Sequence, residues 1–305
     1  PPRSTPKPSS AASDVYKRQK GGPTDQRLRM LGQFNNRIQG HTGATPNLAT
    51  LARLQHDPAE AHLLENASAP VSYLEQFAEA DQQRIRQVLE TITSGQMLDL
   101  QRFAYASSDS IIPLTREEEL DDYTYRVAGC VGKFWTHISL SHLFEVDAGT
   151  EARLLETGVR FGKGLQLVNI LRDLPADLSI GRCYIPGTVL AEHNLTPSDL
   201  LELESMSQFR PLYDSYLDKA TAHLEAAVDY ISLLPYRQFR LRTAAMLPVL
   251  IGKRTLAMLR SRNVLDATNR IKISRLQVKQ LTRQTILAIP SRRRSQRLLE
   301  VHHHE

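Results

Sequence analysis

Apolar side chains recur every three or four residues along most of the chain from about residue 27 onward. Residues at that spacing share one face of a helix, so the pattern predicts amphipathic helices. Runs of alternating β-branched residues bounded by turn dipeptides, which would indicate strands, are almost absent. The predicted helices cover residues 82–104, 118–145, 151–174, 210–234 and 240–261. The sequence therefore predicts an all-α fold, with a single domain over residues 27–300.

The two ends of the chain lack this periodicity. Residues 1–26 are rich in Pro, Ser, Gly and Lys, a composition typical of a disordered segment or of sequence foreign to the domain behind it. Residues 301–305 end in three histidines and a glutamate and are expected to form a disordered tail. We assign no function to either end.

The segment 118–145 carries few charges for its length, which is typical of a buried helix. Gly129 and Gly132 lie within it, although glycine lowers helix stability by about 1 kcal/mol. We therefore expect these glycines to allow the close approach of a neighbouring helix or of a ligand. In the helix predicted over residues 240–261, Pro248 should produce a kink or a break between two shorter helices.

A line of polar residues interrupts the apolar helix predicted over residues 151–174. Gln166, Asn169, Asp173 and Asp177 follow one another at steps of three, four and four, so they share one face. Asp173 and Asp177 are suited to hold Mg²⁺, which prefers oxygen ligands and binds one or two carboxylates plus substrate phosphates. Asn169 adds an amide oxygen to the same face.

Two aspartates four residues apart are more often a pair of surface carboxylates, and three features oppose that interpretation here. The preceding residues "GLQLVNIL" are too apolar for a surface helix, and the polar line is unbroken. Arg172 also lies beside the carboxylates, where it can bind a phosphate oxygen. Pro175 removes one helical hydrogen bond between the aspartates, so the helix is expected to distort or end there.

Gln96 and Asp99 form a second polar intrusion on the apolar stripe of the helix over residues 82–104. Taken alone, they indicate either a hydrogen-bonded pair in the core or a helix whose apolar face is misassigned by one position. Tyr123 and Tyr125 flank the start of the segment 118–145, and most tyrosines in such places are packing residues with a hydroxyl at the rim.

The composition and charge of the chain indicate which kinds of ligand and environment to expect. Hydrophobic residues make up 41% and charged residues 23% of the chain, and the net charge is +5, which permits anionic substrates such as diphosphates. The basic clusters at 237–242 and 291–297 are interpreted as solvated faces, so no nucleic-acid partner is expected. Two cysteines cannot form a disulfide framework, which indicates a reducing compartment. No apolar run is long enough to predict a membrane span.

Four segments together resemble the squalene and phytoene synthase family. They are "GQMLDLQRF" at 95–103, "YTYRVAGCVG" at 123–132, "LQLVNILRDLPAD" at 165–177 and "GRCYIP" at 181–186, and their order and spacing also match. The likeness spans about residues 27 to 290. It implies an all-α isoprenoid-synthase fold around a deep apolar cavity, with two aspartate-rich motifs at its mouth that bind Mg²⁺ and diphosphate.

The resemblance also assigns roles to particular residues. It implies that Asp173 and Asp177 are catalytic residues and, with Asn169 beside them, Mg²⁺ ligands. It places Tyr123 near the departing pyrophosphate as a third catalytic residue.

The same resemblance implies residues that contact the diphosphates of the substrates. These are Gln166, Asn169, Arg172 and, through a later segment, Arg270. Asp99 would be a carboxylate at the cavity mouth.

The activity implied is the Mg²⁺-dependent head-to-head condensation of two prenyl diphosphates with release of pyrophosphate. Farnesyl diphosphate, giving presqualene diphosphate and squalene, is placed first, and geranylgeranyl diphosphate, giving phytoene, is placed next. NADPH would be a second cofactor only if squalene is the product. A cytoplasmic location with peripheral contact to a membrane is expected, because the products would be lipids. The oligomeric state is left open.

One departure from the family pattern leaves an alternative. No Asp-x-x-x-Asp occurs before Asp99, although the family has its first aspartate-rich motif upstream; only Glu75 and Glu79 have that spacing. A catalytically inactive member that acts as a binding or assembly protein is therefore the competing hypothesis. A terpene cyclase is a weaker one, because cyclases lack the "VAG" segment.

Overall fold

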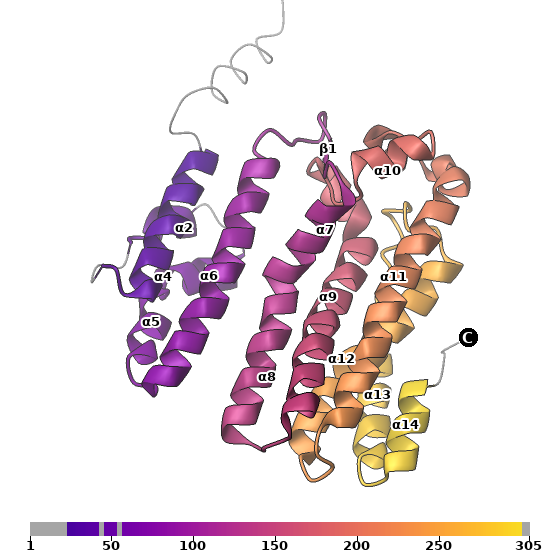
Figure 1. Ribbon diagram of the computed structural model, residues 1–305. Coiled ribbons are helices and arrows are strands. Elements are labelled where there is room, and N and C mark those ends of the chain that lie inside the picture. The colour runs from indigo at the N-terminus through magenta and orange to yellow at the C-terminus, as the bar shows by residue number, and fades with distance from the viewer. Residues whose placement is uncertain (1–22, 43–45, 54–56, 301–305) are drawn as a thin grey trace, which may run out of the picture. The chain divides into compact units, whose positions relative to one another are not determined.

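The computed structural model describes residues 23–42, 46–53 and 57–300. The predicted disordered residues 1–22 and 301–305 lie outside this part of the chain. The chain divides into two compact units, and the boundary lies between Tyr105 and Ala106 (Figure 1).

The first unit is entirely helical in its described residues, and α2 packs along α6. In a small core, Ile38 of α2 is buried with Val71 and Leu74 of α5. Ile85 and Leu89 of α6 pack against this core. Residues 23–26, which were predicted to be disordered, belong to the helix α2. The elements are α2 (Pro23–Gln39), α3 (Ala49–Ala52), α4 (Pro58–Glu65), α5 (Ser68–Leu74) and α6 (Glu79–Arg102).

The second unit is a bundle of long helices with one short parallel strand pair. The pair joins Ile112 to Arg182 and Pro113 to Cys183, which ties the start of the unit to the segment after its longest helix. In order, the elements are β1 (Ile112–Pro113), α7 (Glu117–Thr124), the π-helix η1 (Tyr125–Gly129), α8 (Cys130–His142), α9 (Ala148–Ser179), β2 (Arg182–Cys183), α10 (Gly187–Glu192), the 3₁₀ turns η2 (Pro197–Leu201) and η3 (Leu203–Ser205), α11 (Met206–Leu233), α12 (Phe239–Ser261), α13 (Arg275–Ala288) and α14 (Arg292–Glu300).

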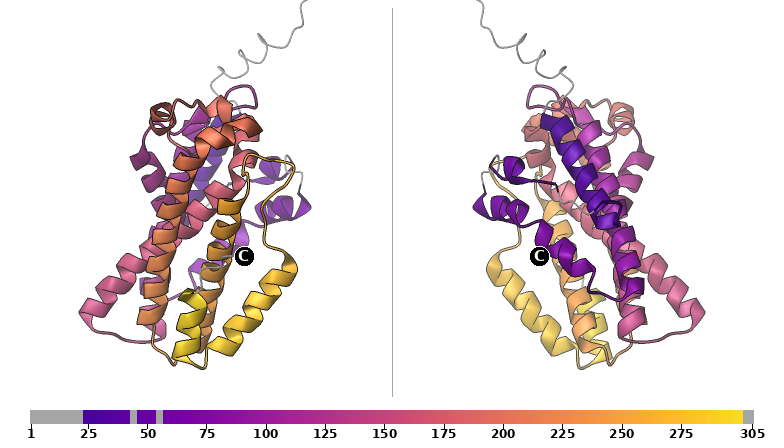
Figure 2. Two further views of the ribbon diagram at one scale, coloured as in Figure 1. Left: turned by 90° about the vertical axis from the view of Figure 1, so that its right-hand side faces the viewer. Right: turned by 90° about the vertical axis from the view of Figure 1, so that its left-hand side faces the viewer.

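The helix α9 is the centre of the second unit and contacts α8, α11 and α12 (Figures 1 and 2). Its core neighbours include Tyr230 and Ile231 of α11 and Met246 and Val249 of α12, all of which are buried. The helix continues through Pro175 to Ser179, so the end expected at this proline does not occur. The helix α12 likewise runs unbroken through Pro248, so of the two expected outcomes the break is wrong.

Two glycines, one in α8 and one in α9, allow α9 to pack closely against α8 and against η1. A Cβ added to Gly132 would lie 1.9 Å from the carbonyl oxygen of Gly158, and one added to Gly162 would lie 2.1 Å from the carbonyl oxygen of Ala128. Real Cβ atoms do not approach main-chain atoms this closely, so only glycine permits this packing. The close helix approach expected at Gly132 is thereby confirmed.

The predicted helix 118–145 consists of three consecutive helical pieces, α7, η1 and α8, and it is not buried on all sides. Val131 is 39% and Trp135 46% exposed, because this face of α8 borders an open apolar cavity. No helix among the described residues has the length and apolar character that crossing a membrane requires.

Candidate active site

Asp173 of α9 lies between two guanidinium groups. Arg172 donates from Nε to Oδ1 at 3.1 Å and from Nη2 to Oδ2 at 2.5 Å, and Arg270 donates from Nη2 to Oδ1 at 3.0 Å. These three residues line one cleft of about 270 Å³, together with Pro175, Asp266 and other residues of the same unit. The structure therefore brings together three of the residues that the resemblance singled out.

Charge controls the protonation of this carboxyl group. Partial burial is the largest single influence and would raise the pKa of Asp173, but hydrogen bonds and positive charge from Arg172 and Arg270 together outweigh it. The pKa of Asp173 therefore lies below its ordinary value. The group is ionised at neutral pH, as a metal ligand or an arginine counter-ion requires.

The other residues of the predicted polar line lie on the same helix but outside this cleft's lining. Gln166 and Asp177 are half-buried and Asn169 is exposed. The described residues contain no group of three or more His, Cys, Asp or Glu side chains placed to hold a metal ion. The assignment of Mg²⁺ to Asn169, Asp173 and Asp177 stays a prediction.

Asp99 lies in α6 of the first unit, where its side chain is buried. Its predicted role at a cavity mouth also stays a prediction.

Tyr123 of α7 stacks on Tyr184, with ring centroids 4.8 Å apart and planes at 23°. Its hydroxyl donates to the Tyr184 hydroxyl at 3.3 Å. Tyr184 directly follows β2, and Tyr123 lies in α7, the next element after β1. The pairing of β1 with β2 therefore helps to bring the two rings together. Tyr184 belongs to the "GRCYIP" segment, but no feature of that motif distinguishes it from its neighbours.

An apolar cavity of about 340 Å³ opens between α8, α9, α11 and α12. Three glycines in its lining leave space for the cavity, and larger side chains such as Trp135 form its walls. Its lining includes Val131, Gly132, Trp135, Gly158, Phe161, Gly162, Leu165 and Tyr230. The apolar cavity that the resemblance implied is therefore present within the second unit.

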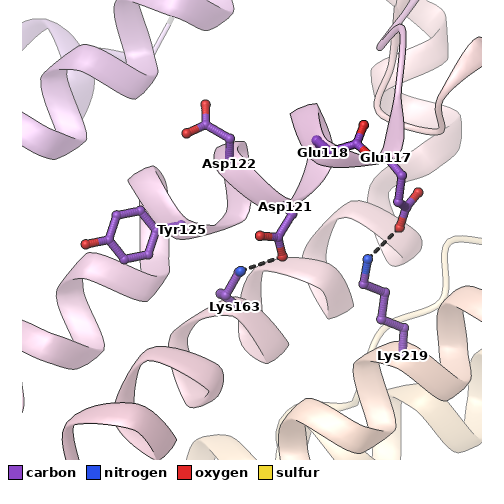
Figure 3. A pocket seen from close by; sticks show the side chains of 7 residues that line it. All are labelled: Glu117, Glu118, Asp121, Asp122, Tyr125, Lys163 and Lys219. Atoms are coloured by element: carbon purple, nitrogen blue, oxygen red, sulfur yellow. Dashed lines mark hydrogen bonds and ion pairs between the residues drawn. The ribbon is translucent and has the colours of Figure 1, made fainter.

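A polar cleft of about 510 Å³ is lined by four acidic residues of α7, of which Asp121 and Glu117 face two lysines (Figure 3). Lys163 of α9 pairs with Asp121 at 2.5 Å, and Lys219 of α11 pairs with Glu117 at 2.5 Å. The Tyr216 hydroxyl also donates to Glu117 at 2.8 Å. These contacts join α7 to α9 and α11 and so fix the helix that carries Tyr123. Neither lysine is recognisable from the sequence, since ion pairs between separate helices leave no local pattern.

Neither cysteine is suited to nucleophilic chemistry. Both thiols are free and buried, and burial raises the pKa of Cys130 to about 11 and that of Cys183 to about 12. The thiols therefore stay protonated at neutral pH.

The model of the squalene/phytoene synthase family matches residues 18–277 of this chain. Among curated proteins, the bifunctional lycopene cyclase/phytoene synthase of Arthroderma gypseum is 32% identical over 151 residues, which are 49% of this chain and 25% of that protein. The protein of the same description from Neurospora crassa is 36% identical over 118 residues, 37% of this chain and 20% of that protein. The chain thus matches a quarter of the length of these relatives or less.

Solved structures share the fold. A complex of TcSQS with a ligand has a TM-score of 0.71 at 18% identity and covers 94% of this chain and 77% of that one. A dehydrosqualene synthase in complex with a ligand has a TM-score of 0.55 at 19% identity, with 86% of each chain covered. Both likenesses confirm the predicted all-α fold. Because the family model covers most of the sequence, including all four segments that carried the resemblance, this chain belongs to the squalene/phytoene synthase family.

Proposed function

We propose that this chain condenses two prenyl diphosphates head to head and releases pyrophosphate. One observation carries the proposal: a single continuous helix, α9, contributes to both an apolar cavity and a cleft that presents two arginines. A prenyl diphosphate has the same division, with an apolar chain at one end and an anionic group at the other.

The arginines suit the diphosphate. A guanidinium group can donate two parallel hydrogen bonds to phosphate oxygens, and Arg172 and Arg270 converge on one point. Asp173 holds both guanidinium groups in place through the pairs described above. When a diphosphate binds, its oxygens can replace part of the Asp173 contacts and keep the arginines in the same positions.

The donor set of α9 fits magnesium. Asn169, Asp173 and Asp177 supply only oxygen atoms, and Mg²⁺ is usually held by one or two carboxylates together with substrate phosphates. When bound, the metal would neutralise the charge of the departing pyrophosphate. NADPH remains a proposal for the squalene product alone.

The apolar cavity suits the other half of the reaction. Loss of pyrophosphate leaves an allylic cation, which water would quench. Walls formed by Phe161, Leu165 and Trp135 offer no nucleophile to such a cation.

Two prenyl lengths compete as substrate. The overall resemblance placed farnesyl diphosphate first, whereas the names of the curated relatives favour the phytoene product and hence geranylgeranyl diphosphate. Incubation of the chain with each diphosphate would decide between them, because the number of carbon atoms in the product identifies the substrate. A cytoplasmic location also stays a proposal.

A binding or assembly protein without catalysis is the second candidate. Its support is the absence of any Asp-x-x-x-Asp before Asp99 in the sequence. The paired Asp173, Arg172 and Arg270 would then bind an anionic ligand without turning it over.

The test is pyrophosphate release by the purified chain with each diphosphate, Mg²⁺ and NADPH, followed by lipid extraction. Asp173→Asn should lower the rate roughly a hundredfold, because the variant loses the negative charge that orients Arg172 and Arg270 and that would bind the metal. Asp229→Asn is the matched control, because Asp229 is an exposed carboxylate of α11 with no proposed role. Equal rates for both variants would refute the role of Asp173. Diphosphate binding by calorimetry without any release would favour the binding protein.

A further inference from the structure

The helix α13 carries large apolar side chains that are exposed to water. In α13, Leu276 is 67%, Ile286 57% and Leu287 70% exposed. Leu281, Thr285 and Ala288 of the same helix are buried, which fixes the inner face of α13 against its neighbours α12 and α14 (Figure 2). Large aliphatic residues that gather on the outer face of a packed helix mark an interaction surface.

The exposed residues of α13 form one continuous face. Leu276, Gln280, Arg283 and Leu287 follow at steps of four, three and four, so they lie along one stripe. Lys279 and Ile286 flank the stripe and are exposed as well. We name these six residues the α13 face; it holds three aliphatic side chains, two cations and no acid. Neither Lys279 nor Arg283 has an ion-pair partner among the described residues.

Positive charge is concentrated in the segment of the chain that carries this face. Between Lys272 and Glu300 the sequence has eight Lys or Arg residues and one acidic residue, Glu300 itself. In α14, Arg293, Arg294 and Arg297 are exposed. The family match ends at residue 277, so most of α13 and all of α14 lie beyond the region that the family model covers.

We propose that the α13 face docks this chain on an anionic lipid surface. A helix that lies in the plane of a membrane buries leucines below the headgroups and keeps lysine and arginine at their level. Each nearby cation is also attracted by the negative charge of the lipids. The choice of a lipid surface over an acidic protein rests on the proposed function, because that reaction makes an apolar product that must leave into a membrane.

Two other occupants fit less well. A second copy of the chain would bring Lys279 and Arg283 of each copy against each other, and like charges across an interface oppose association. A nucleic acid would leave the three aliphatic side chains in water. It would also find no aromatic residue for base stacking between residues 272 and 300.

The test is co-sedimentation of the full chain with vesicles of phosphatidylcholine alone and of phosphatidylcholine mixed with phosphatidylserine. The mixed vesicles should bind the chain, and added salt should weaken binding. Replacing Leu276, Ile286 and Leu287 by glutamine should lower the partition roughly a hundredfold. Replacing Lys279 and Arg283 by glutamine should lower it roughly thirtyfold, at about 1 kcal/mol per cation, and weaken the preference for phosphatidylserine. Glutamine keeps helix propensity, and the helical circular dichroism of each variant checks the fold.

A matched control comes from the same unit. Leu201 and Leu203 are 48% and 46% exposed but lie among Asp199, Glu202 and Glu204. Their replacement by glutamine should leave vesicle binding unchanged. Loss of binding in this control equal to that in the α13 variants would overturn the proposal.

Two further outcomes would also overturn it: no binding to mixed vesicles, or a dimer in sedimentation velocity that the α13 variants dissociate. Vesicle binding is measured without diphosphate, so it reports on the surface even if pyrophosphate release fails. The α13 variants should keep release in detergent solution, which separates the two proposals.

Discussion

Replacing Gly132 by alanine tests whether the contact between α8 and α9 depends on the absence of a side chain. The new Cβ would lie 1.9 Å from the carbonyl oxygen of Gly158 and 2.6 Å from its carbonyl carbon. An ordinary contact is about 3.5 Å, so the methyl group would overlap the main chain of α9 by roughly 1.5 Å. No rotamer change can relieve the overlap, because both partners are backbone atoms of a helix.

The expected loss follows from two opposing effects. Over-packing in a well-packed interior costs about 1–3 kcal/mol, and an overlap with main-chain atoms belongs at the upper end of that range. Alanine in place of glycine within a helix recovers about 1 kcal/mol. The free energy of unfolding should therefore fall by about 2 kcal/mol or more for Gly132→Ala.

The assay is urea unfolding followed by tryptophan fluorescence and far-ultraviolet circular dichroism. Trp135 is the sole tryptophan of the chain and lies one turn after Gly132, so its emission reports on α8 itself. Gly132→Ala should lower the urea midpoint with little change of slope. The control is Gly32→Ala in α2, where none of the described residues lies within 4 Å of the added Cβ. That variant should gain about 0.5–1 kcal/mol. If Gly132→Ala were as stable as the natural sequence, the close contact between α8 and α9 would be refuted.

Two further predictions concern charged groups of the second unit. Burial, and after it the positive charge of nearby basic residues, lowers the pKa of His223 to about 4, whereas the unfolded chain binds a proton near its ordinary pKa of about 6.5. The folded chain should therefore lose stability as the pH falls from about 6.5 toward 4, and His223→Gln should remove that part of the pH dependence of Tm; an unchanged profile would contradict it. Lys219→Met should lower Tm by about 1–2 °C in calorimetry, because its pair with Glu117 is partly exposed and contributes about 0.5 kcal/mol. Lys219→Arg should restore Tm, and equal losses in both variants would argue against the pair.

Periodicity predicted the long helices well because each must bury an apolar stripe. The helix predicted over residues 82–104 is α6, and that over 151–174 is α9, which in fact spans Ala148–Ser179. The differences lie at the ends, where single side chains decide. The helix α9 begins early because the Asp147 side chain accepts a hydrogen bond from the backbone of Thr150. It ends late because Pro175 did not stop it.

The residues of the candidate site could be predicted only in part from the sequence pattern. The polar line on α9 marked Asp173, but its pairing with Arg270 spans 97 residues, and only the family resemblance suggested that arginine. Tyr184 and the two lysines behind α7 were missed, because each meets its partner through the fold rather than along a helix. Spacing along one helix is visible in a sequence, whereas contacts between helices depend on how they pack.

The continuity of α9 relates the stability of this unit to its proposed chemistry. Gly158 and Gly162 lie in its first half, where they permit close packing of α8 and η1 and also line the apolar cavity. Asp173 lies eleven residues after Gly162, so the rigid helix holds the arginine cleft about 16 Å along its axis from this part of the cavity wall. A residue larger than glycine at position 158 would therefore displace α8, and one at position 162 would displace η1. Either change would reduce the cavity while leaving the arginine cleft intact. Such a variant should bind inorganic pyrophosphate normally and yet condense prenyl diphosphates poorly, a combination that a structural defect throughout the unit would not produce.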